Sequence, residues 1–365
     1  MRALRIYAGP QARQHLERHG LQAGDVRIVP AAAGGPKGLI LGPLDRFIFG
    51  RWLAASTHEV HLVGASIGAW RMATACLEDP RTAFERLEHD YIHQHYELQA
   101  GQKRPSPDLV SQRFGQSLRD FYGGRIHAVL THPRYRLHVM TTRGRHLLRR
   151  EHSVLTPLAY LGAFLSNVAQ RKAMGAWLER VVFSAPDGGH AGAPCASLPF
   201  ATADYRTRQL PLTEENFMPA LQASCSIPFV LRAVRQIPGA PAGAYWDGGI
   251  IDYHLHLDYA TGNHGLVLYP HFQQAVVPGW LDKGLRWRHR ATPFLDRMVL
   301  LAPDPQWVRT LPHGKLPDRT DFTRYGNDLA GRVRTWTTAV QASVQLAEEF
   351  QAWLEKPDLG RVQAL

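Results

Sequence analysis

A serine between two glycines is the residue of this 365-residue sequence best suited to do chemistry. Residues 64–68 read Gly-Ala-Ser-Ile-Gly and join an apolar run to a helical pattern over residues 67–77. The G-x-S-x-G pattern holds its serine on a sharp strand-to-helix turn, where Gly64 and Gly68 avoid clashes. The free amides and the dipole at the start of that helix would favour negative charge at Ser66. We therefore expect a nucleophile at Ser66; the alternative is that the glycines only let a buried strand turn into a helix.

A nucleophilic serine needs N–H donors that stabilise the oxyanion formed when it attacks a carbonyl group. Residues 34–38 read Gly-Gly-Pro-Lys-Gly and lie between a predicted strand and a predicted helix. The amides of Gly34 and Gly35, with that of Lys37 or Gly38, are candidate donors, whereas the proline has no N–H. The alternatives are a phosphate-binding turn and a simple helix entry. The loop fits neither the dinucleotide-binding glycine pattern nor the P-loop pattern.

The general base that takes the serine proton has two kinds of candidate. The first is a histidine that follows Ser66, as the chain order Ser, acid, His requires: His254, His256, His264 or His271. The second is Asp247, which ends an apolar approach and is followed by two glycines. Such an aspartate lies on a tight loop with its side chain exposed, although an Asp-Gly pair is also a common turn.

Three motifs together resemble those of the patatin-like phospholipase family. They are Gly-Gly-Pro-Lys-Gly at 34–38, Gly-Ala-Ser-Ile-Gly at 64–68 and Asp-Gly-Gly at 247–249, in the family's order and spacing. The segment 220–230, Ala-Leu-Gln-Ala-Ser-Cys-Ser-Ile-Pro-Phe-Val, is similar to the family's ASxAxP segment, with Ser226 where alanine is usual. The resemblance covers roughly residues 25 to 255.

The resemblance implies a serine lipid acyl hydrolase of the phospholipase A or lysophospholipase type. It would use a Ser-Asp dyad and an acyl-enzyme intermediate, with Ser66 as nucleophile and Asp247 as base. The oxyanion hole would be formed by amides in the glycine loop: those of Gly34 and Gly35, with Lys37 or Gly38. A lipid ester is the expected partner, and no metal or cofactor is implied. Two alternatives stay open: an acyltransferase or thioesterase with the same dyad, and a non-catalytic lipid-binding member of the fold.

The sequence also departs from the family pattern at several points. Ala33 stands where the family has the first of three glycines, and Pro36 stands where an apolar residue is common. The Asn-Pro pair that often follows the family's Asp-Gly-Gly motif is missing, and the chain from about residue 256 onward has no counterpart.

The order of predicted elements indicates an α/β protein. Strand, loop, helix, strand, turn and helix patterns follow one another over residues 25–33, 34–38, 39–54, 58–63, 64–68 and 67–77. Further strands are predicted at 134–143, 180–184, 200–204, 265–269 and 298–302. The resemblance implies a three-layer α/β/α sandwich around a mainly parallel central sheet.

We see no clear domain boundary in the sequence. The chain is therefore expected to form a single patatin-like α/β hydrolase domain over residues 1–365, with an insertion near residues 80–130. An unassigned C-terminal extension, about residues 256–365, contains an amphipathic helix pattern over residues 325–354.

The composition is that of a globular protein, with 45% hydrophobic and 20% charged residues. The three cysteines, Cys76, Cys195 and Cys225, are far apart and form no zinc or CxxC spacing, which fits a reducing compartment. We read no signal-peptide pattern at the N-terminus and no apolar stretch long enough to span a bilayer. We therefore expect a cytoplasmic protein.

The formal net charge is +11, from 42 basic and 31 acidic side chains, and it favours anionic partners. The basic residues form no nucleic-acid motif, so no nucleic-acid partner is expected. Trp280 and Trp287 stand among basic residues between 283 and 290, a mixture that suits peripheral contact with an anionic membrane. The alternative is a plain surface loop. The sequence predicts no oligomeric state.

Three other segments allow more than one interpretation. Residues 154–178 are apolar over most of their length and predict a buried helix, or alternatively a lipid-facing element beside the site. His89 and His93, four residues apart, could bind a metal, but the missing HExxH pattern favours a surface helix. Residues 252–258 alternate polar and apolar side chains, which favours a strand with a solvated polar face over a set of ligands. The segment starts five residues after Asp247, so the alternative is that it lines the mouth of the site.

Overall fold

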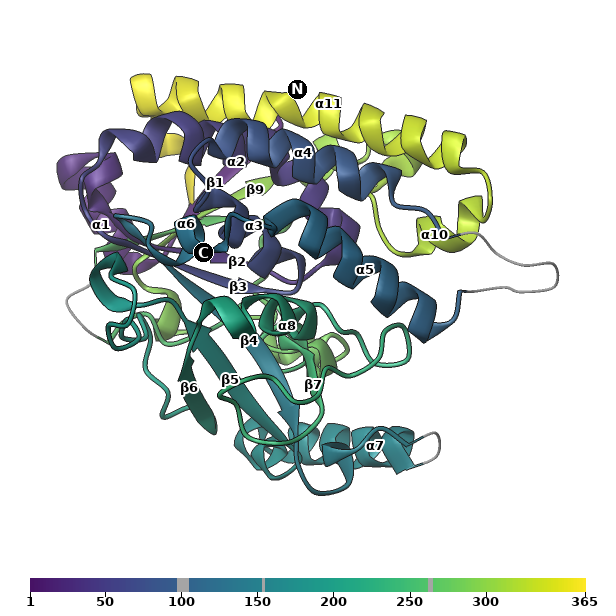
Figure 1. Cartoon of the computed structure of the whole chain (residues 1–365). Coiled ribbons are helices and arrows are strands. Elements are labelled where there is room, and N and C mark those ends of the chain that lie inside the picture. Colours follow the sequence, from purple (N-terminus) through teal and green to yellow (C-terminus); the bar gives the residue numbers. More distant parts are fainter. Residues whose placement is uncertain (97–104, 153–154, 262–264) are drawn as a thin grey trace.

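The structure, a computed structural model, describes residues 1–96, 105–152, 155–261 and 265–365. One sheet runs through it in the order β10-β1-β9-β8-β2-β3-β4-β5-β6, and β7 pairs with β4 (Figure 1). Most neighbouring strands are parallel, whereas β1–β9, β4–β5 and β4–β7 are antiparallel. The strands are β1 (Leu4–Ala8), β2 (Val26–Ala31), β3 (Val60–Ala65), β4 (Tyr135–Gly144), β5 (Leu178–Ser184), β6 (Thr207–Pro211), β7 (Tyr245–Asp247), β8 (Leu266–Pro270), β9 (Met298–Pro303) and β10 (Val362–Ala364). The predicted α/β class with a mainly parallel central sheet is therefore confirmed.

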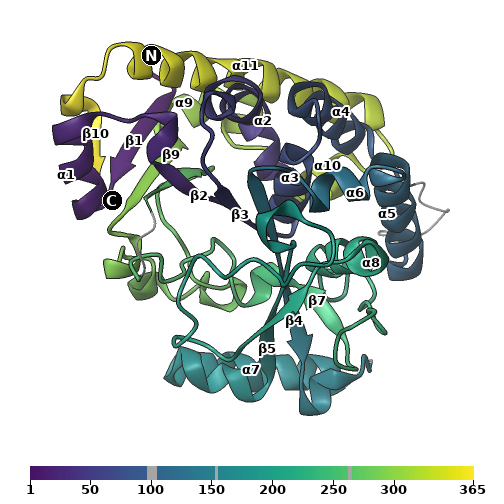
Figure 2. The same ribbon diagram turned by 60° about the vertical axis from the view of Figure 1, so that its left-hand side comes forward.

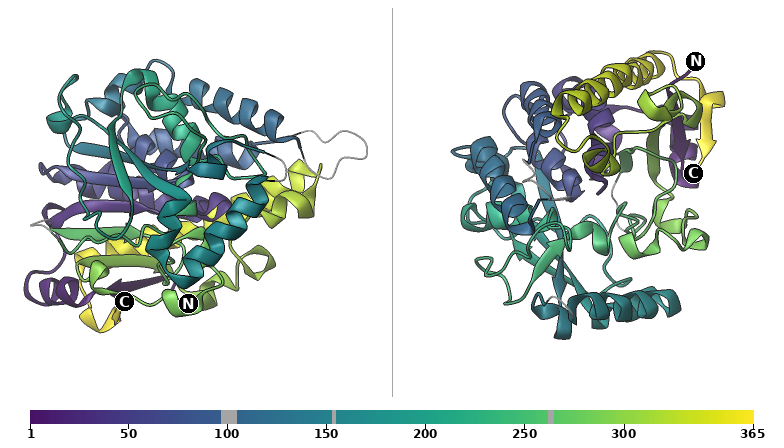
Figure 3. Two further views of the ribbon diagram at one scale, coloured as in Figure 1. Left: turned by 90° about the horizontal axis from the view of Figure 1, so that it is seen from below. Right: turned by 90° about the vertical axis from the view of Figure 1, so that its right-hand side faces the viewer.

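Helices cover the sheet on different sides. The long helix α11 packs against α2 and α4, and it lies across the molecule from α7, with strands between them (Figures 1 and 2). The right-hand view of Figure 3 shows the same opposition. The helices are α1 (Pro10–His19), α2 (Gly42–Phe47), α3 (Ile67–Ala75), α4 (Pro80–His93), α5 (Pro107–Tyr122), α6 (Ile126–Leu130), α7 (Leu155–Ala169), α8 (Glu214–Ser224), α9 (Pro305–Val308), α10 (Thr320–Tyr325) and α11 (Leu329–Glu355). None of the helices in the described part of the chain is long and apolar enough to cross a membrane.

The middle of the sheet is buried on both faces. Every residue of β3, β8 and β9 is buried. The sequences of strands that are covered on both faces are typically continuous apolar runs, without alternating polar residues. This is why the apolar runs in the sequence identified several of these strands.

The predicted helix over residues 39–54 is not continuous. The chain forms a 3₁₀ turn η2 (Gly35–Leu41), then α2, then a π-helical turn η3 (Ile48–Trp52). Pro43 at the start of α2 has no amide hydrogen, so it cannot continue a helical hydrogen-bond ladder from η2. The apolar spacing therefore identified the buried face correctly and missed the breaks.

Two more predicted elements differ from the structure. Residues 200–204 do not form a strand, and Ala201 makes only an isolated bridge to Asp258. A strand needs a partner along its length, and β5 pairs with β6 instead. The helix pattern over residues 325–354 is found mainly in α11, because Gly326, with a φ of 50°, separates α10 from α11.

The two segments without an assigned role both contribute to the fold. Residues 80–130 supply α4, α5 and α6, which connect the parallel strands β3 and β4. That this segment is an insertion stays a prediction. Residues 256–365 supply β8, β9, β10 and α11, and β10 pairs in parallel with β1. The last strand of the chain therefore forms an edge of the sheet beside the first strand.

Candidate functional site

The register of the sheet brings together Ser66 and Asp247, which lie 181 positions apart in the chain. β3 runs parallel to β4 and pairs its last residue, Ala65, with Met140. β7 runs antiparallel to β4 and pairs Asp247 with Thr141, the next residue of β4. Because β5 occupies the other edge of β4, β3 and β7 meet on the same edge. Ser66, which follows Ala65, therefore lies next to Asp247.

Ser66 occupies a strained turn between β3 and α3. Its φ of 56° and ψ of −129° lie in a region that residues other than glycine rarely populate. The flanking glycines allow the turn to pack closely. A Cβ at Gly64 would lie 2.4 Å from the Cα of Ala69, and one at Gly68 would lie 1.9 Å from the carbonyl oxygen of Ala31. The small residues of the G-x-S-x-G pattern are therefore required by backbone contacts.

The two side chains are joined by a direct hydrogen bond. Oγ of Ser66 donates to Oδ2 of Asp247 at 2.7 Å, and Oδ1 of Asp247 accepts from the amide of Gly249 at 2.7 Å. Ser66 is 4% exposed and Asp247 is 5% exposed. Burial raises the pKa of Asp247 above its ordinary value, and the Ser66 hydrogen bond and the charge of Arg319 oppose this rise. A carboxylate with a raised pKa is a stronger base, so this arrangement can accept the serine proton.

Two residues at the end of α8 contact the serine, and sequence reasoning did not single them out. Oγ of Ser224 accepts from the amide of Ser66 at 3.0 Å and donates to the carbonyl of Met140 at 2.7 Å. The buried thiol of Cys225 lies within hydrogen-bonding reach of Ser66, and burial raises the pKa of that thiol well above its usual range. Both residues lie within the segment 220–230, in which the sequence comparison drew attention only to Ser226. The ASxAxP-like motif therefore located this segment but did not indicate which of its residues contact Ser66.

The glycine loop lies next to the same pair. Gly35 opens η2, and the first amides of a helical turn have no partner inside the turn. η2 packs on the start of α3, since a Cβ at Gly38 would lie 3.4 Å from Cγ2 of Ile67. The loop also adjoins the Asp-Gly-Gly segment, since a Cβ at Gly249 would lie 2.6 Å from the Cβ of Ala33. The three motifs are therefore neighbours in space, and the candidate donors in this loop are Gly34, Gly35, Lys37 and Gly38.

The candidate histidines are engaged elsewhere. Nδ1 of His254 lies 3.1 Å from the carbonyl of Ala275, and Nδ1 of His256 lies 2.9 Å from that of Val276. Burial lowers the pKa of both imidazoles, and it lowers the pKa of His271 to about 3. Among the described residues, no histidine is hydrogen-bonded to Ser66, and His264 lies outside them. Asp247 is thus the base candidate that the fold places at the serine.

The prediction of a solvated strand over residues 252–258 is wrong. Asp252, His254 and His256 are buried, and they follow a turn after β7. Nε and Nη2 of Arg180 each donate to Asp252 at 2.7 Å, and both of these side chains are buried. The alternation of polar and apolar residues reflects internal ion pairing and hydrogen bonding, which a period-two pattern cannot distinguish from exposure.

Helix α7 covers only residues 155–169 of the predicted buried helix over 154–178, and it is buried on one face only. Ala159, Tyr160 and Ala163 face the protein and belong to a buried cluster with Trp246 and Ile250, which flank the Asp247 loop. The opposite face carries four apolar side chains at helical spacing that are 39–60% exposed: Leu158, Leu161, Leu165 and Val168. We call these four residues the α7 apolar stripe.

Three cations border the site. Nζ of Lys37 lies 5.3 Å from the ring centroid of Phe272, and Nζ of Lys283 lies 4.1 Å from that of Tyr253. Nε of Arg319 would lie 3.2 Å from a Cβ at Gly35, so its guanidinium lies over the glycine loop. Lys283 and Arg319 come from the part of the chain after residue 256. Lys283 belongs to the basic segment 283–290, for which the sequence predicted membrane contact, and Arg319 belongs to no motif. Only the fold places them beside the site.

The described residues hold no group of three or more His, Cys, Asp or Glu side chains that could bind a metal. His89 and His93 stack on each other at a centroid distance of 4.1 Å, and His89 is exposed on α4. They fit the surface-helix interpretation.

No protein-family model matches this chain, and no curated protein matches it. The fold and the site together define an α/β protein with a buried serine–aspartate pair. This pair lies where β3 and β7 meet on one edge of β4.

Proposed function

We propose that this chain is a serine acyl hydrolase of the phospholipase A or lysophospholipase type, acting on lipid esters. The observation that carries the proposal is the 2.7 Å hydrogen bond from Ser66 Oγ to Asp247 Oδ2, made at a strained strand-to-helix turn. The resemblance of three motifs to those of patatin-like phospholipases supports the same reaction. The sheet with helices on different sides is compatible with the three-layer sandwich expected of that family.

The reaction would proceed through an acyl-enzyme. Oγ of Ser66 attacks the ester carbonyl carbon while Asp247 takes its proton, and amides of Gly34 and Gly35 stabilise the oxyanion. The ester C–O bond then breaks, and Asp247 returns the proton to the leaving oxygen. A water molecule attacks the acyl carbon, gives its proton to Asp247, and releases the fatty acid as the proton returns to Ser66. Asp247 thus acts first as base and then as acid in each half-reaction.

An aspartate can serve as the only base because of where it lies. An ordinary aspartate has a pKa near 3.9 and is a weak base at neutral pH. Here burial raises the pKa of Asp247, and the hydrogen bond holds the serine proton on the line of transfer. Both effects lower the barrier for proton transfer without a histidine.

The α7 apolar stripe supports a lipid as the source of the ester. Exposed apolar side chains in one row are unusual on a soluble surface and indicate an interaction site. Nη2 of Arg288 donates to the carbonyl oxygens of Asn167 and Val168, which fastens the segment 280–290 beside α7. That segment adds Trp287, which is 63% exposed, together with basic side chains. An aromatic ring and leucine side chains with basic side chains around them suit binding to an anionic lipid surface.

The decisive experiment combines active-site labelling with product analysis. Wild-type protein should be labelled at Ser66 by a fluorophosphonate and should hydrolyse lysophospholipids and nitrophenyl esters. Ser66→Ala should abolish both, and Asp247→Asn should lower hydrolysis by on the order of 10³-fold or more. Ser117→Ala, at an exposed serine on α5, is the matched control and should keep full activity.

The outcomes separate the alternatives. Absence of labelling and of hydrolysis would indicate a non-catalytic lipid-binding protein. Transfer of the acyl group to added alcohol or coenzyme A, in place of water, would indicate an acyltransferase, and preference for thioesters would indicate a thioesterase. If replacing His254, His256, His264 or His271 by glutamine is as damaging as Ser66→Ala, a triad replaces the dyad.

A further inference from the structure

The three cations that border the site are not held in ion pairs by carboxylates of the described residues. Within the described residues, Lys37, Lys283 and Arg319 make no ion pair, although most other buried or half-buried basic side chains do. Lys37 is half-buried, whereas Lys283 and Arg319 are exposed and can meet a ligand from solvent. Unpaired cations at the rim of a catalytic site are candidates for binding an anionic part of the substrate.

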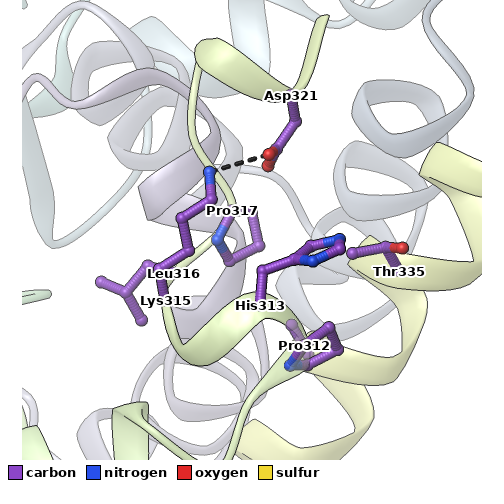
Figure 4. A pocket seen from close by; sticks show the side chains of 8 residues that line it. Pro312, His313, Lys315, Leu316, Pro317, Asp321 and Thr335 are labelled. Carbon is purple, nitrogen blue, oxygen red and sulfur yellow. Dashed lines mark hydrogen bonds and ion pairs between the residues drawn. The ribbon is translucent and has the colours of Figure 1, made fainter. Parts of the chain in front are cut away.

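The neighbouring charges of the same segment are already neutralised. Lys315, four residues before Arg319, pairs with Asp318 at 2.9 Å and with Asp321 at 2.7 Å, and Figure 4 shows its ammonium directed at Asp321. Asp318 is the carboxylate that acts most strongly on Lys37, and it is engaged by Lys315. The hollow in Figure 4 is lined by neither Ser66 nor any of the three cations, so it is a separate feature.

The charge of Arg319 acts on both lysines. The pKa of Lys283 is lowered to about 8, by partial desolvation of its ammonium group among the neighbouring atoms and then by the charges of Arg319 and Lys37. The pKa of Lys37 is lowered by burial and also by Lys315 and Arg319, against the charge of Asp318. The geometry brings the three side chains to the same loops. Arg319 lies over Gly35 in the glycine loop that carries Lys37, and Lys283 lies over the ring of Tyr253, whose Cδ2 would be 3.5 Å from a Cβ at Gly249. A bound anion would relieve the repulsion between these charges.

We propose that Lys37, Lys283 and Arg319 form a subsite for the phosphate monoester of an acylated substrate, such as an acylglycerol phosphate. This proposal rests on the proposed hydrolase function and narrows it to esters that carry a terminal phosphate. The cations adjoin the glycine loop, so the phosphate would bind a few bonds away from the carbonyl that Ser66 attacks.

The chemistry of the phosphate matches the subsite. A phosphate monoester offers three terminal oxygens and a charge of about −1.5 to −2 at neutral pH, whereas a diester offers two such oxygens and one charge. The subsite offers three cationic donors. The planar guanidinium of Arg319 can bind two phosphate oxygens at once, and each lysine can bind another.

The experiment compares three substrates with one acyl chain, used below their aggregation concentration: an acylglycerol phosphate, an acylglycerophosphocholine and an uncharged acylglycerol. Wild-type protein should show the highest kcat/KM for the acylglycerol phosphate. Arg319→Ala and Lys283→Ala should each lower that value by roughly ten- to hundredfold, since each removes a charge-assisted hydrogen bond. With the uncharged acylglycerol the same variants should lose much less, because only the effect of these charges on Asp247 is removed. Arg319→Lys, which keeps the charge, should recover part of the loss with the acylglycerol phosphate.

Matched controls come from the opposite edge of the sheet. Arg18 on α1 and Lys356 after α11 are exposed, so Arg18→Ala and Lys356→Ala remove the same charges far from the site. These variants should behave like wild type with all three substrates. Equal preference of the wild type for charged and uncharged esters, or equal losses in the controls, would overturn the subsite. Preference for the phosphocholine ester would overturn the assignment to a monoester.

A binding measurement keeps the subsite testable even without hydrolysis. Inorganic phosphate should bind to the Ser66→Ala protein in calorimetry, and Arg319→Ala in that background should weaken this binding at least about tenfold. Phosphate binding without labelling of Ser66 would contradict the hydrolase and support the subsite. Labelling and acylglycerol hydrolysis without phosphate binding would support the hydrolase and contradict the subsite.

Discussion

At the residue scale, Asp247 has two properties that oppose each other. Its burial makes the carboxylate a better base, and the same burial makes its charge costly to the folded state. Hydrogen bonds from Ser66 and Gly249 compensate part of that cost. A residue that favours the reaction at the expense of stability is expected at a catalytic site and not at a purely structural one.

The pH dependence follows from this residue. Protonated Asp247 cannot take the serine proton, so kcat/KM for a neutral ester should fall on the acid side, and the fall should begin above the ordinary aspartate pKa of about 3.9. Because folding raises this pKa, ionisation of Asp247 lowers stability as pH rises through the folded-state pKa. Asp247→Asn should therefore be inactive at neutral pH without a lower free energy of unfolding. Urea denaturation at pH 7 checks this, and clear destabilisation would contradict it.

The glycine at position 68 provides a steric test of the same turn. A Cβ there would lie 1.9 Å from the carbonyl oxygen of Ala31, so Gly68→Ala must displace β2 or α3. We expect the free energy of unfolding to fall by at least about 1–3 kcal/mol, and labelling of Ser66 to be lost. Gly24→Ala is the control, because its Cβ would lie 3.6 Å from the nearest side chain. Normal labelling of Gly68→Ala would show that the turn tolerates a side chain.

At the element scale, α7 has different roles on its two faces. Its buried face packs on the residues that flank Asp247. Tyr160 also contacts Phe229, which lies five residues after Ser224, the residue whose Oγ accepts a hydrogen bond from the Ser66 amide. Its outer face carries the apolar stripe, with the exposed basic residues Arg149 and Arg150 shortly before it. Under the proposed function, a helix of this kind would couple binding at a lipid surface to the position of Asp247.

Replacing two leucines of the stripe tests that role. The double variant Leu158→Gln/Leu161→Gln should hydrolyse esters in anionic vesicles at least about tenfold more slowly, because each leucine contributes roughly 1.5–3 kcal/mol when buried in lipid. Hydrolysis of a monomeric ester should not change. Val344→Gln, at a 41% exposed residue of α11, is the control for an exposed apolar residue elsewhere. Equal vesicle activity of the double variant and this control would exclude the stripe as the lipid-binding surface.

At the scale of the whole molecule, one sheet connects the site to both ends of the chain. Strands β1, β9 and β10 lie on one side of β8 and β2, and the site strands β3, β4 and β7 lie on the other. α11 packs against β1 and α2, and its buried residues include Trp336, Phe350 and Trp353. The part of the chain after residue 256 is therefore built into the same sheet as the site.

This continuity predicts that damage at α11 reaches the site. Trp353→Ala removes a buried ring that stacks on Phe350, and it should lower the free energy of unfolding by about 3–5 kcal/mol. Unfolding followed by circular dichroism and loss of Ser66 labelling should have the same midpoint. Trp287→Ala, at an exposed tryptophan, should leave that midpoint nearly unchanged. Separate midpoints for the two signals would show that the site folds independently of α11.

The sequence by itself determined the features that depend on neighbouring residues. The serine turn needs small residues at positions 64 and 68, and buried parallel strands need continuous apolar runs, so both could be read locally. The glycine loop and the Asp-Gly-Gly segment were recognised for the same reason. Breaks such as the one at Pro43, and the missing strand at residues 200–204, depend on hydrogen-bond partners that a local pattern does not show.

Only the tertiary structure decided which groups meet at Ser66. The chain has 19 histidines, and their spacing in the sequence could not exclude those near the site as the base. Their hydrogen bonds to backbone carbonyls in the structure argue against that role. Asp247 reaches the serine because β3 and β7 share one edge of β4, a consequence of strand register over 181 residues. Lys283 belongs to the basic segment 283–290 and Arg319 to no motif, and both reach the site through the packing of loops. Which side chains from distant segments meet at the site is determined by the pairing of the strands in the sheet, because this pairing determines which loops lie side by side.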